Sequence, residues 1–174
     1  NTDCTWKIVT GHVPVYTTNP GGANKVYMNQ VSKAMEDADI DFYFAGDAHS
    51  YARTAPMTEL KVDEEDGVVY YISGSTGGKS YSVVDNPEYN FEIATLDFES
   101  VYIAVNADFD SIEVTAYNVD TSGNKHVLDT YKKEIPYCEN DEHPFIYDTM
   151  KQKWVIMKRG ALCTNDLQNG WIFV

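Results

Sequence analysis

The sequence predicts an α/β fold in which one β-α-β unit is followed by a mostly antiparallel meander. Two short apolar runs, at 6–10 and 40–45, each end in glycine and flank one helical pattern. That order is typical of two parallel, neighbouring strands. From residue 91 onward, apolar and polar residues alternate between short polar turns, as in antiparallel strands. The two parts of the chain therefore favour different strand arrangements.

The β-α-β unit begins with the strand over 6–10, which Pro14 separates from the loop at 17–24. The helical pattern follows, and its apolar residues lie on one face: Tyr27, Val31, Ala34, Met35 and Ala38. The run at 40–45 is almost continuously apolar, as expected of a strand that is covered on both faces.

The next segment predicts a hairpin of strands over 57–62 and 68–72, with an acidic turn at 63–67. Residues 73–79 are rich in glycine and serine but lack the Walker spacing, so they either cradle phosphate or form a conformational turn near the site. The meander then has strands over 91–97, 101–105 and 112–116, a turn over 118–124 and a fourth strand over 126–132.

The composition is that of a folded, acidic protein. Lys plus Arg number 13 against 27 Asp plus Glu in 174 residues, a net charge of −14, which disfavours binding to nucleic acid or anionic membranes. No run approaches the roughly 18 apolar residues of a membrane span. The chain starts with neither an initiator Met nor a signal peptide pattern, so we expect it to begin inside a longer precursor.

The chain is predicted to divide at the acidic, turn-rich segment 137–144 into a main part, 1–136, and a C-terminal extension, 137–174. The extension resembles the aromatic hairpin repeats of Gram-positive surface proteins, and a plain pair of terminal strands is the alternative. We expect an extracellular or cell-surface location. The three cysteines, Cys4, Cys138 and Cys163, are too few for a disulfide framework or a zinc cluster. One disulfide and one free thiol would be compatible with this number.

Two histidines, His12 and His49, follow corresponding strands of the β-α-β unit, and Asp47 lies beside the second. Since the carboxyl ends of parallel strands meet at one edge of a sheet, both histidines are expected at that edge, where ligands bind. The set indicates metal binding or acid-base chemistry. His126 and His143 fall in a late strand and an acidic turn and are interpreted as structural.

Two motifs carry a resemblance to a known family. The first is Val9-Thr10-Gly11-His12 followed by Pro14, and the second is Gly46-Asp47-Ala48-His49-Ser50-Tyr51-Ala52-Arg53. Together they resemble the later motifs of the calcineurin-like metallophosphoesterases, and within them the purple acid phosphatases. The resemblance covers about 6–134 and implies the C-terminal half of a metallophosphoesterase αββα sandwich.

The resemblance implies a centre of two metal ions, drawn from Fe, Zn, Mn or Mg. His12 is then a ligand of the second metal and His49 of the first, while Asp47 replaces a histidine. A carboxylate is a harder ligand, so it shifts the preference towards Mn or Mg.

Four further residues are implied near the site. Tyr51 and Arg53 are candidate catalytic residues, and Arg53 either pairs with phosphate or anchors the loop to an acidic neighbour. Tyr16 and Asn19 either line the substrate mouth or belong to a solvated loop.

The function implied is metal-dependent hydrolysis of a phosphate ester. The family's earlier motifs do not occur in this sequence, so the expected partner is the N-terminal half of the same catalytic domain, and we expect this chain alone to be inactive. One alternative is a non-catalytic, phosphatase-like binding or structural module with a degenerate metal site. Another is a surface module that binds glycans through Trp154 and Trp171.

Overall fold

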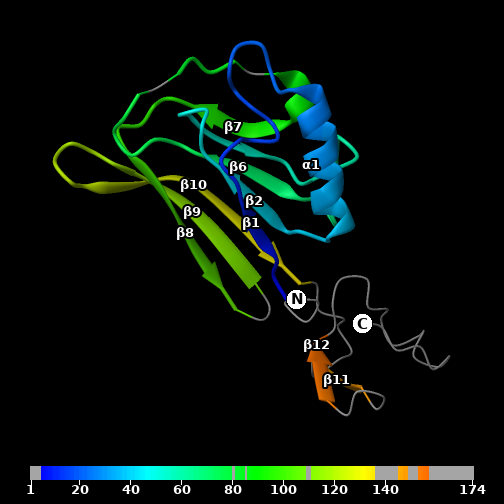
Figure 1. Ribbon diagram of the computed structural model, residues 1–174. Coiled ribbons are helices and arrows are strands. Elements are labelled where there is room, and N and C mark those ends of the chain that lie inside the picture. The colour runs from blue at the N-terminus through cyan, green and yellow to red at the C-terminus, as the bar shows by residue number, and fades with distance from the viewer. Residues whose placement is uncertain are drawn as a thin grey trace.

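A five-stranded mixed sheet carries the first part of the chain (Figure 1). β1 (Ile8–Thr10), β2 (Phe42–Ala45) and β6 (Val69–Ser73) run parallel. β3 (Tyr51–Thr54) pairs antiparallel with both β6 and β7 (Phe91–Thr95). This computed structural model describes residues 5–79, 81–84, 86–108 and 111–135, and the backbone of 145–148 and 153–156. The spatial order of the strands in this sheet is β1, β2, β6, β3 and β7.

Helix α1 (Lys25–Asp37) joins β1 to β2 and covers one face of this sheet (Figure 1). Asn24 caps it, because its side-chain oxygen accepts hydrogen bonds from the backbone N–H groups of Val26 and Tyr27 at 3.0 and 3.2 Å. Met28 is buried against the sheet. β1 and β2 are parallel neighbours, so the predicted β-α-β unit is confirmed.

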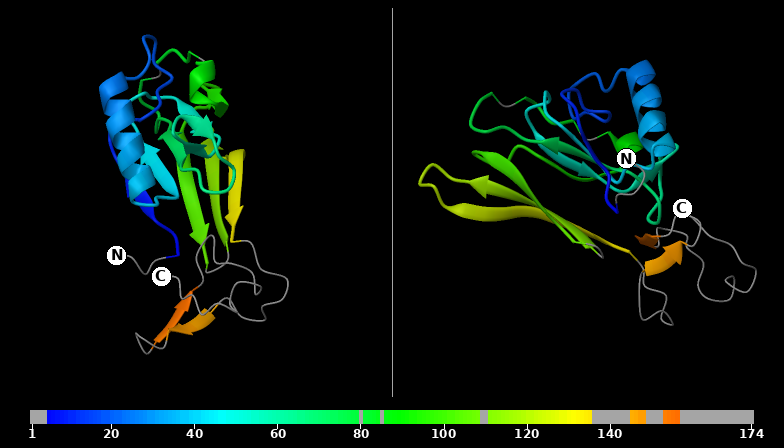
Figure 2. Two further views of the ribbon diagram at one scale, coloured as in Figure 1. Left: turned by 90° about the vertical axis from the view of Figure 1, so that its right-hand side faces the viewer. Right: turned by 60° about the horizontal axis from the view of Figure 1, so that its bottom comes forward.

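A three-stranded antiparallel sheet packs on the opposite face (Figure 2). It consists of β8 (Val101–Ala107), β9 (Ser111–Val119) and β10 (Lys125–Glu134), with β9 in the middle. The described part of the chain thus has one helical layer and two sheet layers, and the predicted α/β class is confirmed.

The sequence of β2 explains why these layers pack. Successive side chains of a strand point to opposite faces. Tyr43 and Ala45 accordingly join the cluster beneath α1, while Phe42 and Phe44 join the cluster between the two sheets. Burial on both faces accounts for the continuous apolar run, as the sequence predicted.

Two details of the predicted strand pairing are wrong. Of the predicted hairpin between 57–62 and 68–72, only an isolated antiparallel bridge between Met57 and Val68 forms. β6 itself lies between β2 and β3, and β4 (Met57–Thr58) pairs with β5 (Lys61–Val62). β7 belongs to the first sheet rather than to the meander, because it pairs with β3. In both cases burial in the five-stranded sheet prevails over pairing with the nearest strand in sequence.

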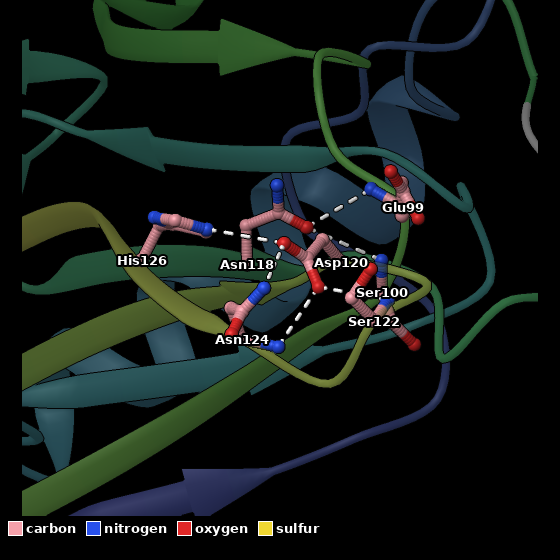
Figure 3. A network of polar contacts seen from close by, with 7 residues as sticks. All are labelled: Glu99, Ser100, Asn118, Asp120, Ser122, Asn124 and His126. Atoms are coloured by element: carbon pink, nitrogen blue, oxygen red, sulfur yellow. Dashed lines mark hydrogen bonds and ion pairs between the residues drawn. The ribbon is translucent and has the colours of Figure 1, made fainter.

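A tight turn joins β9 to β10 (Figure 3). The Asp120 carboxylate accepts hydrogen bonds from the side-chain amide of Asn124 at 3.0 Å and from the backbone N–H groups of Asn124 and Ser122 at 2.8 and 2.9 Å. These bonds lower the pKa of Asp120 to about 2, and the two bonds from Asn124 contribute most to the shift. His126 Nε2 lies 3.4 Å from the same carboxylate, so this histidine sits at the turn.

The C-terminal extension is described only at β11 (Phe145–Asp148) and β12 (Lys153–Ile156), which pair antiparallel. The rest of the predicted extension lies outside the described residues, as do His143, Trp171 and all three cysteines. The described residues form one α-helix, α1, of 13 residues, and a short 3-10 helix, η1 (Pro87–Tyr89), and neither is long and apolar enough to cross a membrane.

Candidate functional site

The ends of β1 and β2 lie side by side at one edge of the sheet, as the sequence predicts. The backbone N–H of Gly11 donates to the carbonyl of Phe44 at 2.9 Å, and that of Gly46 donates to the carbonyl of His12 at 3.1 Å. These two bonds hold both loops together beyond the last strand residues. His12 Nε2 consequently lies 3.5 Å from Asp47 Oδ1.

Gly11 is required by this close approach. A Cβ atom at position 11 would overlap the side chain of Tyr43, whose hydroxyl donates to the carbonyl of Val13 at 3.0 Å. The absence of a side chain at position 11 therefore lets the first loop lie against β2.

Asp47 and His49 both have left-handed backbone conformations, with φ of 57° and 52°. The N–H of Ala48 donates to the carbonyl of Gly46 at 2.6 Å, which closes a three-residue turn around Asp47. Ala48 is fully buried between them. Asp and His adopt positive φ more readily than most residues, but each such residue still costs about 1–3 kcal/mol.

His49 contacts the last residue of the glycine-rich loop and a residue just beyond it. Its Nδ1 lies 2.7 Å from the backbone carbonyl oxygen of Lys79. Its ring stacks on Tyr81, with centroids 4.6 Å apart and an interplanar angle of 26°. Lys79 ends the segment 73–79, which the sequence marks as a loop near the site, whereas no motif or spacing marks position 81.

A pocket of about 620 Å³ adjoins Asp47 and His49. One wall comes from the glycine-rich loop and the other from β8, so the lining is partly polar and partly apolar. Gly74, at φ 77°, packs directly on Val101, and Ser75 accepts a hydrogen bond from the N–H of Val101 at 2.8 Å. The loop is thereby attached to the second sheet, and its predicted contact with phosphate stays a prediction. The lining residues are Phe44, Asp47, His49, Ser73, Gly74, Ser75, Thr76, Gly78, Val101, Tyr102, Ile103 and Val105.

Tyr51 and Arg53 lie on β3, and their polar groups contact Asp129 on β10. Arg53 donates from Nε and Nη2 to the two oxygens of Asp129 at 2.7 and 3.1 Å, and the Tyr51 hydroxyl donates at 2.8 Å. Burial raises the pKa of Asp129, but the bonds from Arg53 and Tyr51 outweigh it and leave that pKa below its ordinary value. This is the anchoring geometry foreseen as one of two roles for Arg53, and a catalytic role stays a prediction.

Tyr16 and Asn19 are not among the residues that line the pocket beside His49. Tyr16 is buried in the cluster beneath α1, where its ring meets Tyr70 edge-on at 4.8 Å, and burial raises its pKa. Asn19 lines a separate pocket of about 390 Å³ near the start of α1. Their assignment to substrate binding stays a prediction.

The described residues fit part of a metal centre. Within them, no group of three or more His, Cys, Asp or Glu side chains gathers closely enough to hold an ion. The 3.5 Å between His12 Nε2 and Asp47 Oδ1 does match the separation of about 3.4 Å between two ligands on a tetrahedral ion with bonds of about 2.1 Å. This distance permits the two side chains to act as ligands of one ion.

Comparison with known proteins gives a likeness in fold. No family model and no curated protein matches the sequence. Among solved structures, purple acid phosphatase PPD1 from yellow lupin seeds aligns with a TM-score of 0.60 and 15% identity over 74% of this chain. GAP50, the anchor in the inner membrane complex of Plasmodium, aligns with a TM-score of 0.59 and 15% identity over 77% of this chain.

The chain spans only 25% of the lupin phosphatase and 38% of GAP50. At such low identity a structural likeness establishes the fold alone. The chain accordingly has part of a metallophosphoesterase-like fold.

Proposed function

We propose that this chain supplies part of the active site of a metal-dependent phosphate ester hydrolase. The observation that carries the proposal is the placement of His12 and Asp47, 3.5 Å apart at the ends of adjacent parallel strands, with His49 two residues further on. The fold shared with a purple acid phosphatase supports it. When bound, a pair of metal ions acidifies water and neutralises negative charge on phosphate.

Each residue of the site has a proposed task. His12 and Asp47 supply a nitrogen and a carboxylate to one ion, and His49 supplies a nitrogen to the other. Their side chains are open to solvent, at 81% exposed for His12 and 47% for Asp47, which leaves room for further ligands and for a substrate. Because Asp47 is a hard oxygen ligand, we propose a preference for Mn²⁺ or Mg²⁺ in the ion that it binds.

The missing ligands are proposed to come from the N-terminal half of the same catalytic domain. Two features support this partner. Among the described strands, β1 pairs only with β2, and β8 pairs only with β9, so each sheet has an edge with unpaired backbone groups. Val105, which lies on the apolar β8, is 42% exposed. Exposed strand edges are usually covered or otherwise protected in native proteins.

The experiment is hydrolysis of p-nitrophenyl phosphate by the full-length polypeptide, stripped of metal and then supplied with Mn²⁺, Mg²⁺, Zn²⁺ or Fe²⁺. Turnover is expected only with added metal, and His12→Ala, Asp47→Ala and His49→Ala are each expected to lower kcat/KM at least about 100-fold. His126→Ala, a histidine at the β9–β10 turn, is the matched control and is expected to keep full turnover. Absence of both bound metal and turnover under all four conditions would refute the hydrolase.

A non-catalytic module is the second candidate, and Asp47 favours it. The motif that the sequence resembles has histidine at position 47, and the described residues hold no group of three metal-binding side chains. Asp47→His separates the two candidates. Metal and turnover that appear only in this variant would indicate that the native residue has disabled the site.

The predicted location, extracellular or at the cell surface, rests on the C-terminal extension and remains a proposal. Fractionation of cells with an antibody against the full-length protein tests it. Recovery in the cytosolic fraction alone would contradict it.

A further inference from the structure

His49 is held in one orientation by two contacts from a single short segment. The carbonyl of Lys79 meets its Nδ1 at 2.7 Å, and the ring of Tyr81 stacks on the imidazole at 4.6 Å and 26°. Both contacts come from residues 30 or more positions further along the chain. They restrain different motions, because the hydrogen bond fixes which edge of the ring faces Lys79 and the stack fixes the plane of the ring.

The hydrogen bond also determines which nitrogen carries the proton. A carbonyl oxygen can only accept a hydrogen bond, so Nδ1 must be the donor. In the neutral imidazole, Nε2 then has no proton and presents its lone pair. Histidines that bind metal commonly donate their other N–H to a backbone carbonyl or a carboxylate, and this contact sets both the tautomer and the ring direction.

Stacking on Tyr81 restrains the rotation of the His49 ring that the hydrogen bond leaves free. The outer side-chain torsion of histidine has a broad energy profile, so the ring can turn about a single hydrogen bond. An offset, nearly parallel aromatic neighbour opposes that rotation. Tyr81 is itself 43% exposed, and the core packs without it, so its ring is available for this contact.

We propose that Tyr81 is a positioning residue which, with the carbonyl of Lys79, holds His49 as the Nδ1–H tautomer with Nε2 free to bind a metal ion. The inference rests on the proposed function, because that function makes His49 Nε2 a metal ligand. It concerns the orientation of His49, however, which is measurable without metal or substrate.

The test is long-range ¹H–¹⁵N NMR of the metal-free, full-length protein, which reads the protonation of each ring nitrogen of His49. Wild type is expected to show a protonated Nδ1 and an unprotonated Nε2. Tyr81→Ala is expected to show a mixture of tautomers and about tenfold weaker binding of Mn²⁺ by calorimetry. Tyr81→Phe, which keeps the ring, is expected to match wild type in both measurements.

Tyr117→Ala is the matched control, since Tyr117 is also stacked, on Tyr102 at 5.2 Å, but does not touch His49. An Nε2–H tautomer in wild type would overturn the proposal, and so would an unchanged tautomer and affinity in Tyr81→Ala. The wild-type spectrum needs no variant, so a folding defect in Tyr81→Ala leaves a decisive measurement. Absent turnover with the expected tautomers would refute the hydrolase and leave the positioning role standing.

Discussion

Replacing Asp129 with alanine is expected to destabilise the fold by at least about 4 kcal/mol. Asp129 is the only acceptor that the structure gives to the Tyr51 hydroxyl and the Arg53 guanidinium among the described residues. The side chains of Arg53 and Asp129 are just 11% and 12% exposed, so water cannot readily replace the lost bonds. Removing one member of a buried pair costs about 3–5 kcal/mol, and an orphaned hydroxyl adds about 1–3 kcal/mol where it stays dry.

Two further variants distinguish the effect of the buried ion pair on stability from a general disruption of the core. Arg53→Met combined with Asp129→Leu removes both charges and is expected to cost at least about 2 kcal/mol less than Asp129→Ala, since no charge is left buried alone. Asp37→Ala breaks the exposed pair of Lys33 and Asp37, 2.8 Å apart on α1, and is expected to leave stability unchanged.

The assay is equilibrium unfolding in guanidinium chloride, followed by circular dichroism and extrapolated linearly to water. Asp129→Ala within about 0.5 kcal/mol of wild type would refute the reasoning, because that is the range of ordinary surface substitutions. A double variant as unstable as the sum of its two single variants would refute it as well. Such a result would also favour a catalytic role for Arg53, because its guanidinium would not be required by Asp129.

Two more predictions follow from the structure. Gly11→Ala is expected to destabilise the protein by about 1–3 kcal/mol because the new methyl overlaps Tyr43, and to cost less in a Tyr43→Phe background; equal losses in thermal melts of the two backgrounds would contradict this. Asp120→Ala is expected to lower the denaturation midpoint at pH 7. The Asp120 pKa of about 2 lies below its unfolded value of about 3.9, so its stabilising effect is complete above pH 4 and is lost as the pH falls towards 2. The gap between wild type and Asp120→Ala should therefore narrow at low pH, and a constant gap from pH 7 to pH 2 would count against the role of this turn.

Local patterns were sufficient to predict the β-α-β unit. The helix itself is marked by spacings of three and four residues, and both adjacent strands are marked by glycine where they leave the sheet. The predicted buried face is only partly correct, because Met28 and Ser32 are buried while Ala34 and Ala38 are exposed. The same signals placed His12, Asp47 and His49 at the sheet edge, because a parallel pair brings its carboxyl ends together.

Pairing between distant segments could not be predicted in the same way. β6 was assigned to a hairpin because a turn precedes it, although its residues are buried on both faces of a central position. An alternating pattern likewise does not say which sheet a strand such as β7 will join. Strand identity is a local property, whereas strand order depends on which surfaces the folded chain buries.

The contacts of the candidate site that join distant parts of the chain could not be predicted either. The pairing of Arg53 with Asp129 joins residues 76 positions apart, so the sequence left its role open between phosphate and an acidic neighbour. The contact between His49 and Lys79 uses a backbone oxygen, which every residue possesses. No side-chain pattern in a sequence can mark such a partner.

The left-handed backbone at position 47 limits how this site can change over evolutionary time. Few residues tolerate φ near 57°, and apart from glycine they are chiefly asparagine, aspartate and histidine. All three of these side chains are metal ligands, but they differ in charge and hardness. The geometry of the loop therefore favours exchange among these residues at position 47. In the proposed metal centre, a single codon change at position 47 would alter the metal preference without rebuilding the loop.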